Sequence, residues 1–224
     1  MIYNKHRPKK FYEVVGQQSS RTLLRQSQLE RFVHTYLFYG QSGSGKTTCA
    51  RLLSMSLLCQ NKVDGEPCGI CYDCKSIQSV SNIDVIEINA GQTHRIEDIL
   101  DLCSKAYLCP TNGRRKIYII DEAHSLTNSA QNALLKLLEE PPELLTVILC
   151  TTDEKNLLET IKSRCQCLPF PKVPKHIISE YLKVIAQVEN IVLDELAYEP
   201  IAERSNGNVR TALTLLDEAF CLVS

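Results

Sequence analysis

The stretch GQSGSGKT, from Gly40 to Thr47, matches the pattern G-x-x-x-x-G-K-[ST]. Glycines at 40, 43 and 45 let the backbone curl until successive N–H groups point inward, at the positive end of the helix that follows. Residues 34–39 (HTYLFY) are predicted to form a buried strand before the loop, and residues 46–59 a helix after it. A strand, a glycine-rich turn and a helix in this order predict a cradle for the phosphates of a nucleoside triphosphate.

Two side chains of this loop are expected to contact the triphosphate and its metal. Lys46 would reach the β and γ phosphates, and Thr47 would offer its hydroxyl to Mg²⁺. An eight-residue match alone is a weak signal, and the predicted flanking strand and helix make it specific. The predicted nucleotide contacts in this stretch are Gly40, Gln41, Ser42, Gly43, Ser44, Gly45, Lys46, Thr47 and Thr48.

The segment KIYIIDE, residues 116–122, supplies the second half of the predicted site. Residues 117–120 are apolar on both faces, as in a central strand of a parallel sheet. Asp121 follows at the carboxyl end of that strand, where ligands of open α/β sheets bind. Asp121 is expected to support Mg²⁺, and Glu122 is a candidate general base for the attacking water. An Asp-Glu pair alone is more often a solvated strand end, and its combination with the glycine-rich loop favours the functional interpretation.

Length and charge are compatible with a globular enzyme. With 224 residues, 44% of them hydrophobic, the chain can bury one substantial core and a small appended domain. The formal net charge of −1 gives no general indication of nucleic-acid binding, although an excess of Lys and Arg in residues 1–31 predicts a basic edge. Neither a long apolar run nor a signal peptide is evident, so we expect a cytoplasmic protein that does not contact a membrane.

Four of the eleven cysteines have the spacing of a metal site. Cys59, Cys68, Cys71 and Cys74 form the pattern C-x8-C-x2-C-x2-C. Four thiolates fill the tetrahedral shell of Zn²⁺ and leave no position for a substrate, so we predict structural zinc. Four incidental cysteines and an iron–sulfur cluster are the alternatives. The other seven, at 49, 103, 109, 150, 165, 167 and 221, are expected to be small core residues.

Strands and helices are predicted to alternate along most of the chain. Further helices are expected over residues 19–30, 93–107, 130–140 and 157–161, and further strands over 82–89, 116–120, 146–150 and 167–170. This alternation predicts a three-layer α/β/α fold with a parallel sheet. Residues 175–224 lack strand signals and are predicted to form three helices in a small bundle. The expected domains are a nucleotide-binding core at 1–170, with a zinc-binding insertion at 59–74, and a helical domain at 171–224.

The order of several short motifs resembles that of one known family. After the Gly40 loop and the four cysteines come DEAH at 121–124, NALLK at 132–136, LEEPP at 138–142, TTD at 151–153 and SRC at 163–165. Upstream lie Arg7-Pro8 and VVGQ at 14–17. Over essentially its whole length, the chain resembles the gamma/tau subunits of the bacterial DNA polymerase III clamp loader. The resemblance implies an AAA+ ATPase with a P-loop, a small zinc-binding insertion and a C-terminal helical lid.

The resemblance also implies roles for residues that match the family's motifs. Arg164 corresponds to the arginine finger, which reaches the nucleotide site of a neighbouring subunit and can raise the rate about a thousandfold or more. Thr152 corresponds to sensor 1, close to the lytic water or the γ-phosphate. Arg210 resembles sensor 2, which contacts the phosphates from the lid, and Arg7 and Val15 are expected to line the adenine pocket. Without the resemblance, Arg164 and Arg210 would be interpreted as surface residues, and Thr152 as a hydroxyl in a turn.

By the same resemblance, the chain would bind ATP with Mg²⁺ between sheet and lid and use its hydrolysis to load a sliding clamp onto primed DNA. The expected partners are other clamp-loader subunits of the delta and delta-prime type, the clamp, and DNA phosphates in salt-sensitive contacts. Family members usually continue into a collar-forming helical domain, which is not found in these 224 residues. The isolated chain is therefore expected to be largely monomeric, with weak ATPase activity.

Two other classes of function compete with this interpretation. DEAH at 121–124 is also a helicase signature, but such helicases need two tandem motor domains, and 224 residues leave no room for a second one. The other alternative is a non-catalytic clamp-loader scaffold stabilised by zinc, or a nucleic-acid-binding module, with a vestigial Gly40 loop. The intact acidic and basic residues of the predicted nucleotide site argue against that alternative.

Overall fold

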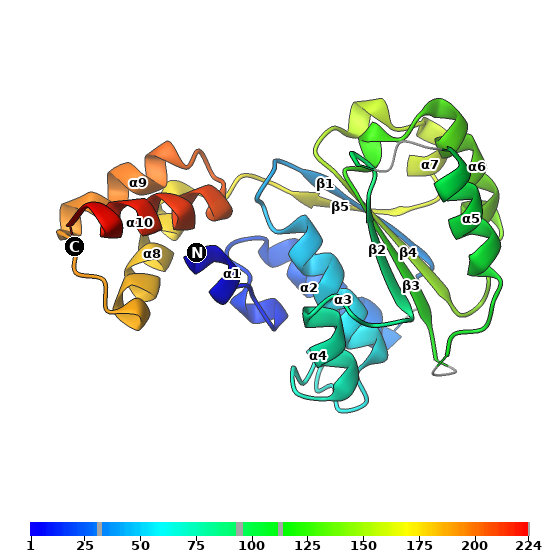
Figure 1. The fold of residues 1–224 in the computed structure, drawn as a ribbon, viewed down its shortest axis with the longest axis horizontal. Helices are drawn as coiled ribbons and strands as arrows, with labels where there is room; N and C mark the ends of the chain where they lie inside the picture. Colours follow the sequence, from blue (N-terminus) through cyan, green and yellow to red (C-terminus); the bar gives the residue numbers. More distant parts are fainter. Residues whose placement is uncertain (31–32, 93–95, 112–113, 224) are drawn as a thin grey trace.

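A five-stranded parallel sheet lies at the centre of the larger part of the molecule, with helices on both faces (Figure 1). The computed structural model describes residues 1–30, 33–92, 96–111 and 114–223. Its strand order is β2–β3–β4–β1–β5, and every pairing is parallel. The three-layer α/β/α fold predicted from alternating strands and helices is thus confirmed.

The strands bring the ends of distant segments to one edge of the sheet. They are β1 (Thr35–Gly40), β2 (Val85–Asn89), β3 (Lys116–Asp121), β4 (Leu145–Thr151) and β5 (Gln166–Phe170). β3 and β4 are buried nearly throughout, because each has a neighbouring strand on both sides and helices on both faces. Since all strands run the same way, the ends of β1, β3 and β4 at Gly40, Asp121 and Thr151 lie at the same edge.

Two layers of helices cover the sheet (Figure 1). One face carries α2 (Gln18–Glu30), α3 (Lys46–Leu58) and α4 (Tyr72–Gln78), and the other carries α5 (Ile96–Ala106), α6 (Asn128–Glu139) and α7 (Glu159–Lys162). Each layer packs on the sheet through its own apolar cluster. The expected start of one helix at Thr93 lies outside the described residues. α6 ends just before Pro141, because the residue preceding a proline disfavours helical geometry.

The cysteine insertion contains a short helix that the sequence pattern did not predict. α4 begins directly after Cys71, and its residues Cys74 and Ile77 are buried against the layer that contains α3. Seven residues are too few to show a helical period, so this helix depends on packing for its stability. The turn that precedes it is closed by an antiparallel bridge between Val63 and Glu66.

The three helices predicted beyond the sheet are present, and they form the lid. They are α8 (Lys175–Glu189), α9 (Tyr198–Arg204) and α10 (Val209–Val223). Ile2 of the short helix α1 (Ile2–Lys5) belongs to the apolar cluster of the lid, and α1 packs against α10. The first residues of the chain therefore lie with its last helices (Figure 1). The domain bounds at 1–170 and 171–224 stay a prediction.

The cysteines outside the insertion differ in burial. Cys49 and Cys150 are fully buried, as expected of core residues. Cys109, Cys167 and Cys221 are exposed, so the expectation that all seven belong to the core was wrong for these three. Burial raises the pKa of Cys49 to about 12, which makes it a neutral core thiol.

In the described part of the chain, no helix combines the length and the apolar character needed to cross a bilayer.

Candidate active site

The glycine-rich loop joins the end of β1 to the start of α3. Gly40, Gly43 and Gly45 have φ angles of 146°, 68° and 100°, which glycine adopts far more readily than other residues. Space is also restricted, because a Cβ atom at Gly40 would collide with the carbonyl of Phe170 and one at Gly43 with the side chain of Asn208. The loop therefore needs glycine where it touches β5 and the lid.

Lys46 is buried beneath this loop. Its Nζ donates hydrogen bonds to the carbonyl oxygens of Gly40 at 2.8 Å and Gln41 at 2.9 Å. Burial lowers the pKa of Lys46, and nearby acidic groups oppose this shift. Because both partners are uncharged carbonyls, the ammonium group can exchange them for phosphate oxygens, which are stronger acceptors.

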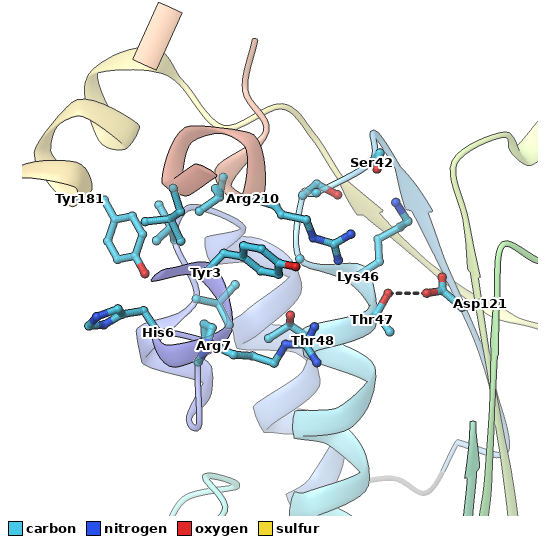
Figure 2. A pocket seen from close by; sticks show the side chains of 18 of the residues that line it. Tyr3, His6, Arg7, Ser42, Lys46, Thr47, Thr48, Asp121, Tyr181 and Arg210 are labelled. Carbon is cyan, nitrogen blue, oxygen red and sulfur yellow. Dashed lines mark hydrogen bonds between the residues drawn. The ribbon is translucent and has the colours of Figure 1, made fainter. Parts of the chain in front are cut away.

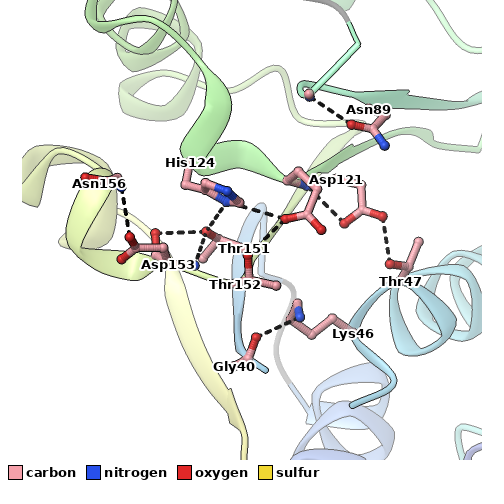
Figure 3. Close-up of polar contacts among 12 residues, drawn as sticks. Gly40, Lys46, Thr47, Asn89, Asp121, His124, Thr151, Thr152, Asp153 and Asn156 are labelled. Carbon is pink, nitrogen blue, oxygen red and sulfur yellow. Dashed lines mark hydrogen bonds and ion pairs between the residues drawn. The ribbon is translucent and has the colours of Figure 1, made fainter. Parts of the chain in front are cut away.

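A hydrogen bond between Thr47 and Asp121 joins the two predicted halves of the site. Thr47 Oγ1 donates to Asp121 Oδ2 at 2.9 Å (Figure 3). The other carboxylate oxygen of Asp121 accepts the N–H of Glu122 at 3.0 Å. Hard oxygen ligands of this kind, supplemented by phosphate oxygens and water, are those that Mg²⁺ prefers. The donor set therefore fits Mg²⁺.

Glu122 has a strained backbone that directs its side chain. Its φ of 51° and ψ of 43° lie in the left-handed region, which costs a residue other than glycine about 1–3 kcal/mol. Its Oε2 accepts a hydrogen bond from Thr152 Oγ1 at 3.1 Å and lies 3.4 Å from Nδ1 of His124. Among the described residues, Oε1 of Glu122 has no hydrogen-bond partner. One oxygen of the carboxylate is thus fixed and the other can accept a proton.

These residues line one end of a pocket between the loop, the N-terminal segment and the lid (Figure 2). The pocket measures about 880 Å³, including its open mouth. The predicted residues that line it are Arg7, Val15, Ser42, Gly43, Ser44, Gly45, Lys46, Thr47, Thr48, Asp121, Glu122 and Arg210. Gly40 and Gln41 contribute through the carbonyls that bind Lys46, and Thr152 through its bond to Glu122.

Two features of the pocket fit a bound triphosphate. The hydroxyl of Ser44 is buried, and in the described part of the chain it has no hydrogen-bond partner. A ligand would remove this unfavourable arrangement. Arg210 extends from the lid toward Lys46 (Figure 2), and its guanidinium makes no ion pair with a described residue. A phosphate group between the two cations would interact favourably with both.

Arg7 faces the pocket from the N-terminal side. Burial lowers the pKa of Arg7, and the guanidinium groups of Arg51 and Arg210 lower it further. Arg51 is itself paired with Glu87 through two hydrogen bonds of 2.7 and 2.8 Å. The guanidinium of Arg7 has no such pair among the described residues, so it is available to a ligand. Its assignment to the adenine pocket stays a prediction.

The remaining wall of the pocket was missed by sequence reasoning. It consists of Tyr3, His6, Pro8, Val14, Tyr181, Val209 and Leu213. Ion pairs tie this N-terminal segment to the lid: Lys5 and His6 bind Glu189 at 2.8 and 2.5 Å. The N–H of Ile2 also donates to Asp217 at 3.2 Å. These partners are at least 183 positions apart, so no local pattern could have indicated them.

Arg164 lies away from the pocket that contains Lys46 and Glu122. It precedes β5, and its carbonyl accepts a hydrogen bond from Thr35 at the start of β1. The length of β1 separates this position from the Gly40 loop by about 17 Å. The guanidinium of Arg164 pairs with Glu139 at 2.7 Å. Arg164 therefore does not contact a nucleotide in the pocket of its own chain.

The four predicted zinc ligands converge on one point. Their Sγ atoms all lie within 4.8 Å of one another, and two of the pairs are 4.0 Å apart. Tetrahedral zinc with Zn–S bonds of about 2.3 Å requires sulfur separations of about 3.8 Å. Burial opposes ionisation of Cys68, but N–H groups of Ile70 and Cys71 and the neighbouring thiols lower its pKa to about 6. The spacing and the ionisable thiol fit a single zinc ion.

Two family models match adjoining parts of the chain. The model described as DNA polymerase III, delta subunit, matches residues 16–174, which include the sheet and the glycine-rich loop. The chain belongs to this DNA polymerase III subunit family. A second model, the RCF1/5-like AAA+ ATPase lid domain, matches residues 180–221. The AAA+ fold with a C-terminal lid, expected from the motifs, is confirmed.

Several bacterial members of the DNA polymerase III family resemble the chain over almost its full length. It is 40% identical to subunit tau/gamma of Haemophilus influenzae, over 99% of this chain and 32% of that protein. It is 39% identical to subunit gamma of Buchnera aphidicola, over 99% and 62%, and to subunit tau of Bacillus subtilis, over 98% and 39%. The resemblance to gamma/tau subunits is confirmed, and the chain spans less than two thirds of each of these relatives.

Solved structures of a branch migration motor share the fold. The Thermotoga maritima RuvB Holliday junction branch migration motor has a TM-score of 0.68 and 21% sequence identity, covering 94% of this chain and 64% of that one. A point mutant of the same RuvB protein has a TM-score of 0.68 and 20% identity, covering 95% and 65%. At this level of identity the likeness supports the arrangement of sheet and lid alone.

Proposed function

We propose that this chain is an ATPase that acts as a motor subunit of a DNA polymerase III clamp loader. The proposal rests on one observation. Thr47, Asp121 and Glu122 lie together at the phosphate end of one pocket. ATP would lie with its phosphates over the Gly40 loop and its base toward Tyr3 and Val15. Mg²⁺ at Thr47 and Asp121 would supply positive charge to the phosphate oxygens.

Glu122 would act as the general base of hydrolysis. Its free Oε1 accepts a proton from water while the water oxygen attacks the γ-phosphorus, and the bond from that phosphorus to the bridging oxygen of ADP breaks. Thr152 holds the other carboxylate oxygen and so keeps the base facing the pocket. Lys46 and Arg210 stabilise the charge that collects on the phosphate oxygens.

Arg164 would serve the nucleotide of a neighbouring subunit. In that assembly its guanidinium would leave Glu139 and contact the neighbour's phosphate oxygens, which are better acceptors because they carry more charge in the transition state. The proposed partners are the other clamp-loader subunits, a sliding clamp and primed DNA, and the proposed location is the cytoplasm. Similarity to gamma and tau subunits supports these partners.

The cysteine cluster would hold one structural Zn²⁺. Four thiolates complete its coordination, so the ion would take no part in hydrolysis. Its effect would be to fix the end of α3 against α4, since the ligands come from the end of one helix, the loop and the start of the other.

A matched pair of variants tests nucleotide binding. Lys46→Ala removes the buried ammonium group, and Lys62→Ala removes an exposed one in the cysteine insertion. We expect Lys46→Ala to weaken binding of a fluorescent ATP analogue with Mg²⁺ about tenfold to a hundredfold, because hydrogen bonds to charged groups contribute about 1.5–3 kcal/mol. Lys62→Ala should bind normally, and both should retain zinc. Unchanged affinity in Lys46→Ala would favour the non-catalytic scaffold.

A further inference from the structure

His124 lies beside Glu122, one of the residues that line the pocket. It belongs to a single turn of 3-10 helix, Ala123–Ser125, that starts directly after the left-handed bend at Glu122. Its Nδ1 is 3.2 Å from Thr151 Oγ1 and 3.4 Å from Glu122 Oε2 (Figure 3). One ring nitrogen therefore faces a hydroxyl and a carboxylate at the same time.

The contacts of Thr151 determine which ring nitrogen carries a proton. Its single hydroxyl proton is donated to the carbonyl of Asp153 at 3.0 Å. The same oxygen accepts the N–H of Asp153 at 3.1 Å. Thr151 then has only a lone pair left for His124, an arrangement that favours Nδ1 as the donor. Thr151 is fully buried at the end of β4, which keeps this arrangement fixed.

The carboxylate of Glu122 independently favours a proton on Nδ1 of His124. Ionised Glu122 can only accept hydrogen bonds, and a lone pair on Nδ1 at 3.4 Å would be repelled by it. A proton on Nδ1 lies between two acceptors, Thr151 Oγ1 and Glu122 Oε2, and attracts both. Both contacts therefore favour the Nδ1–H tautomer of the neutral ring.

We propose that His124 is a positioning residue for Glu122. Its Nδ1–H and the hydroxyl of Thr152 both act on Oε2, which leaves Oε1 directed at the attacking water. Because the side chain of Glu122 is 35% exposed, packing alone does not fix its rotamer. Without the ring, the carboxylate would populate orientations in which Oε1 is too far from the water. The inference rests on the proposed role of Glu122 as the base.

Three variants separate this role from a structural one. His124→Ala removes the donor, whereas His124→Asn keeps an N–H group near the place of Nδ1. We expect His124→Ala to lower kcat about tenfold to a hundredfold, since small displacements of a reacting group have effects of that size. The KM for ATP and the Kd of an ATP analogue should change less than twofold. His124→Asn should recover most of the rate, and His124→Ala should have no further effect in a Glu122→Gln background.

The protonation state is measurable without nucleotide. Nitrogen-15 NMR of the histidine side chains distinguishes the two neutral tautomers, and the signal of His124 is the one lost in His124→Asn. We expect proton attachment at Nδ1. An Nε2–H tautomer, or full kcat in His124→Ala, overturns the inference. Failure of the parent chain to hydrolyse ATP overturns the proposed function and the catalytic part of the inference, while the tautomer still decides the hydrogen-bond arrangement.

Discussion

At the scale of single residues, a comparison of Gly43 with Gly69 distinguishes the effect of backbone conformation from the effect of steric contacts around the residue. Their φ angles, 68° and 75°, are nearly the same. A Cβ at Gly43 would collide with Asn208 of the lid, whereas one at Gly69 has no described residue within 4 Å apart from its neighbours in the chain. Alanine at either position therefore has a similar backbone cost, and at Gly43 alone it also displaces the lid from the loop.

Gly43→Ala is expected to weaken binding of an ATP analogue about tenfold, because overpacking of this kind costs about 1–3 kcal/mol. Gly69→Ala should leave the affinity unchanged. Both should lower the free energy of unfolding in urea by about 1–2 kcal/mol through the left-handed backbone. Equal ATP affinities of the two variants would show that the contact with Asn208 does not shape the site.

Site residues could be predicted from the sequence where the residues that act together are consecutive in the chain. The loop before Lys46 and the acids after β3 are recognisable because the backbone conformation and the strand end are local properties. Tyr3 is different, because it becomes a site residue only through the lid and the Gly40 loop, and the proposed role of His124 depends in part on its contact with Thr151 of β4. Hydrogen-bond partners such as Thr151 cannot be paired with His124 from sequence spacing.

At the scale of elements, burial determines which parts were predictable. β3 is apolar on both faces, and this pattern identified it as a central strand, whereas β4 was predicted only as a strand. α1 and α4 are four and seven residues long, so neither shows a period that sequence analysis can detect. Both are stabilised by packing on other helices, α1 on the distant α10 and α4 on the preceding α3.

The stability of α4 is expected to depend on zinc. Cys68→Ser removes one ligand of the cluster, and Cys109→Ser changes an exposed cysteine outside it. We expect about one zinc per parent chain by metal analysis, with loss of the metal and a lower Tm in Cys68→Ser. Cys109→Ser should resemble the parent chain. Retention of zinc by Cys68→Ser would contradict the assigned ligand set.

The N-terminal segment is expected to hold the pocket closed through Glu189. Hydrogen bonds from Lys5 and then His6 lower the pKa of Glu189 below its ordinary value of 4.5. A lowered pKa stabilises the folded form above pH 4.5, and this contribution is lost as the pH falls through the folded-state value. The segment should therefore be attached at neutral pH and released in acid.

Glu189→Gln should weaken ATP binding at pH 7 by up to about fivefold, as expected for loss of surface ion pairs. Glu180→Gln, on the exposed side of the same helix, is the matched control and should bind as the parent does. The affinity is measured with a fluorescent ATP analogue at pH 7 and in buffers of increasing salt. If Glu189→Gln has parental affinity at low salt, the segment is held by other contacts.

At the scale of the whole molecule, the position of Arg164 predicts a difference between the isolated chain and an assembly. Because Arg164 lies about 17 Å from its own loop, Arg164→Ala should change the ATPase rate of the isolated chain less than twofold. With clamp-loader partners, a clamp and primed DNA, the stimulated rate should fall about a thousandfold. A large loss in the isolated chain would place the guanidinium in its own pocket.

The attachment of Ile2 to Asp217 has a consequence for synthesis on the ribosome. Ile2 can reach its partner Asp217 only after α10 has been synthesised, 215 positions later, while the sheet between them can already fold. A nascent chain halted before α10 would thus contain a folded Gly40 loop without the residues of α10 that cover the pocket. Competence to retain nucleotide is therefore acquired only after α10 has been synthesised and has packed against α1.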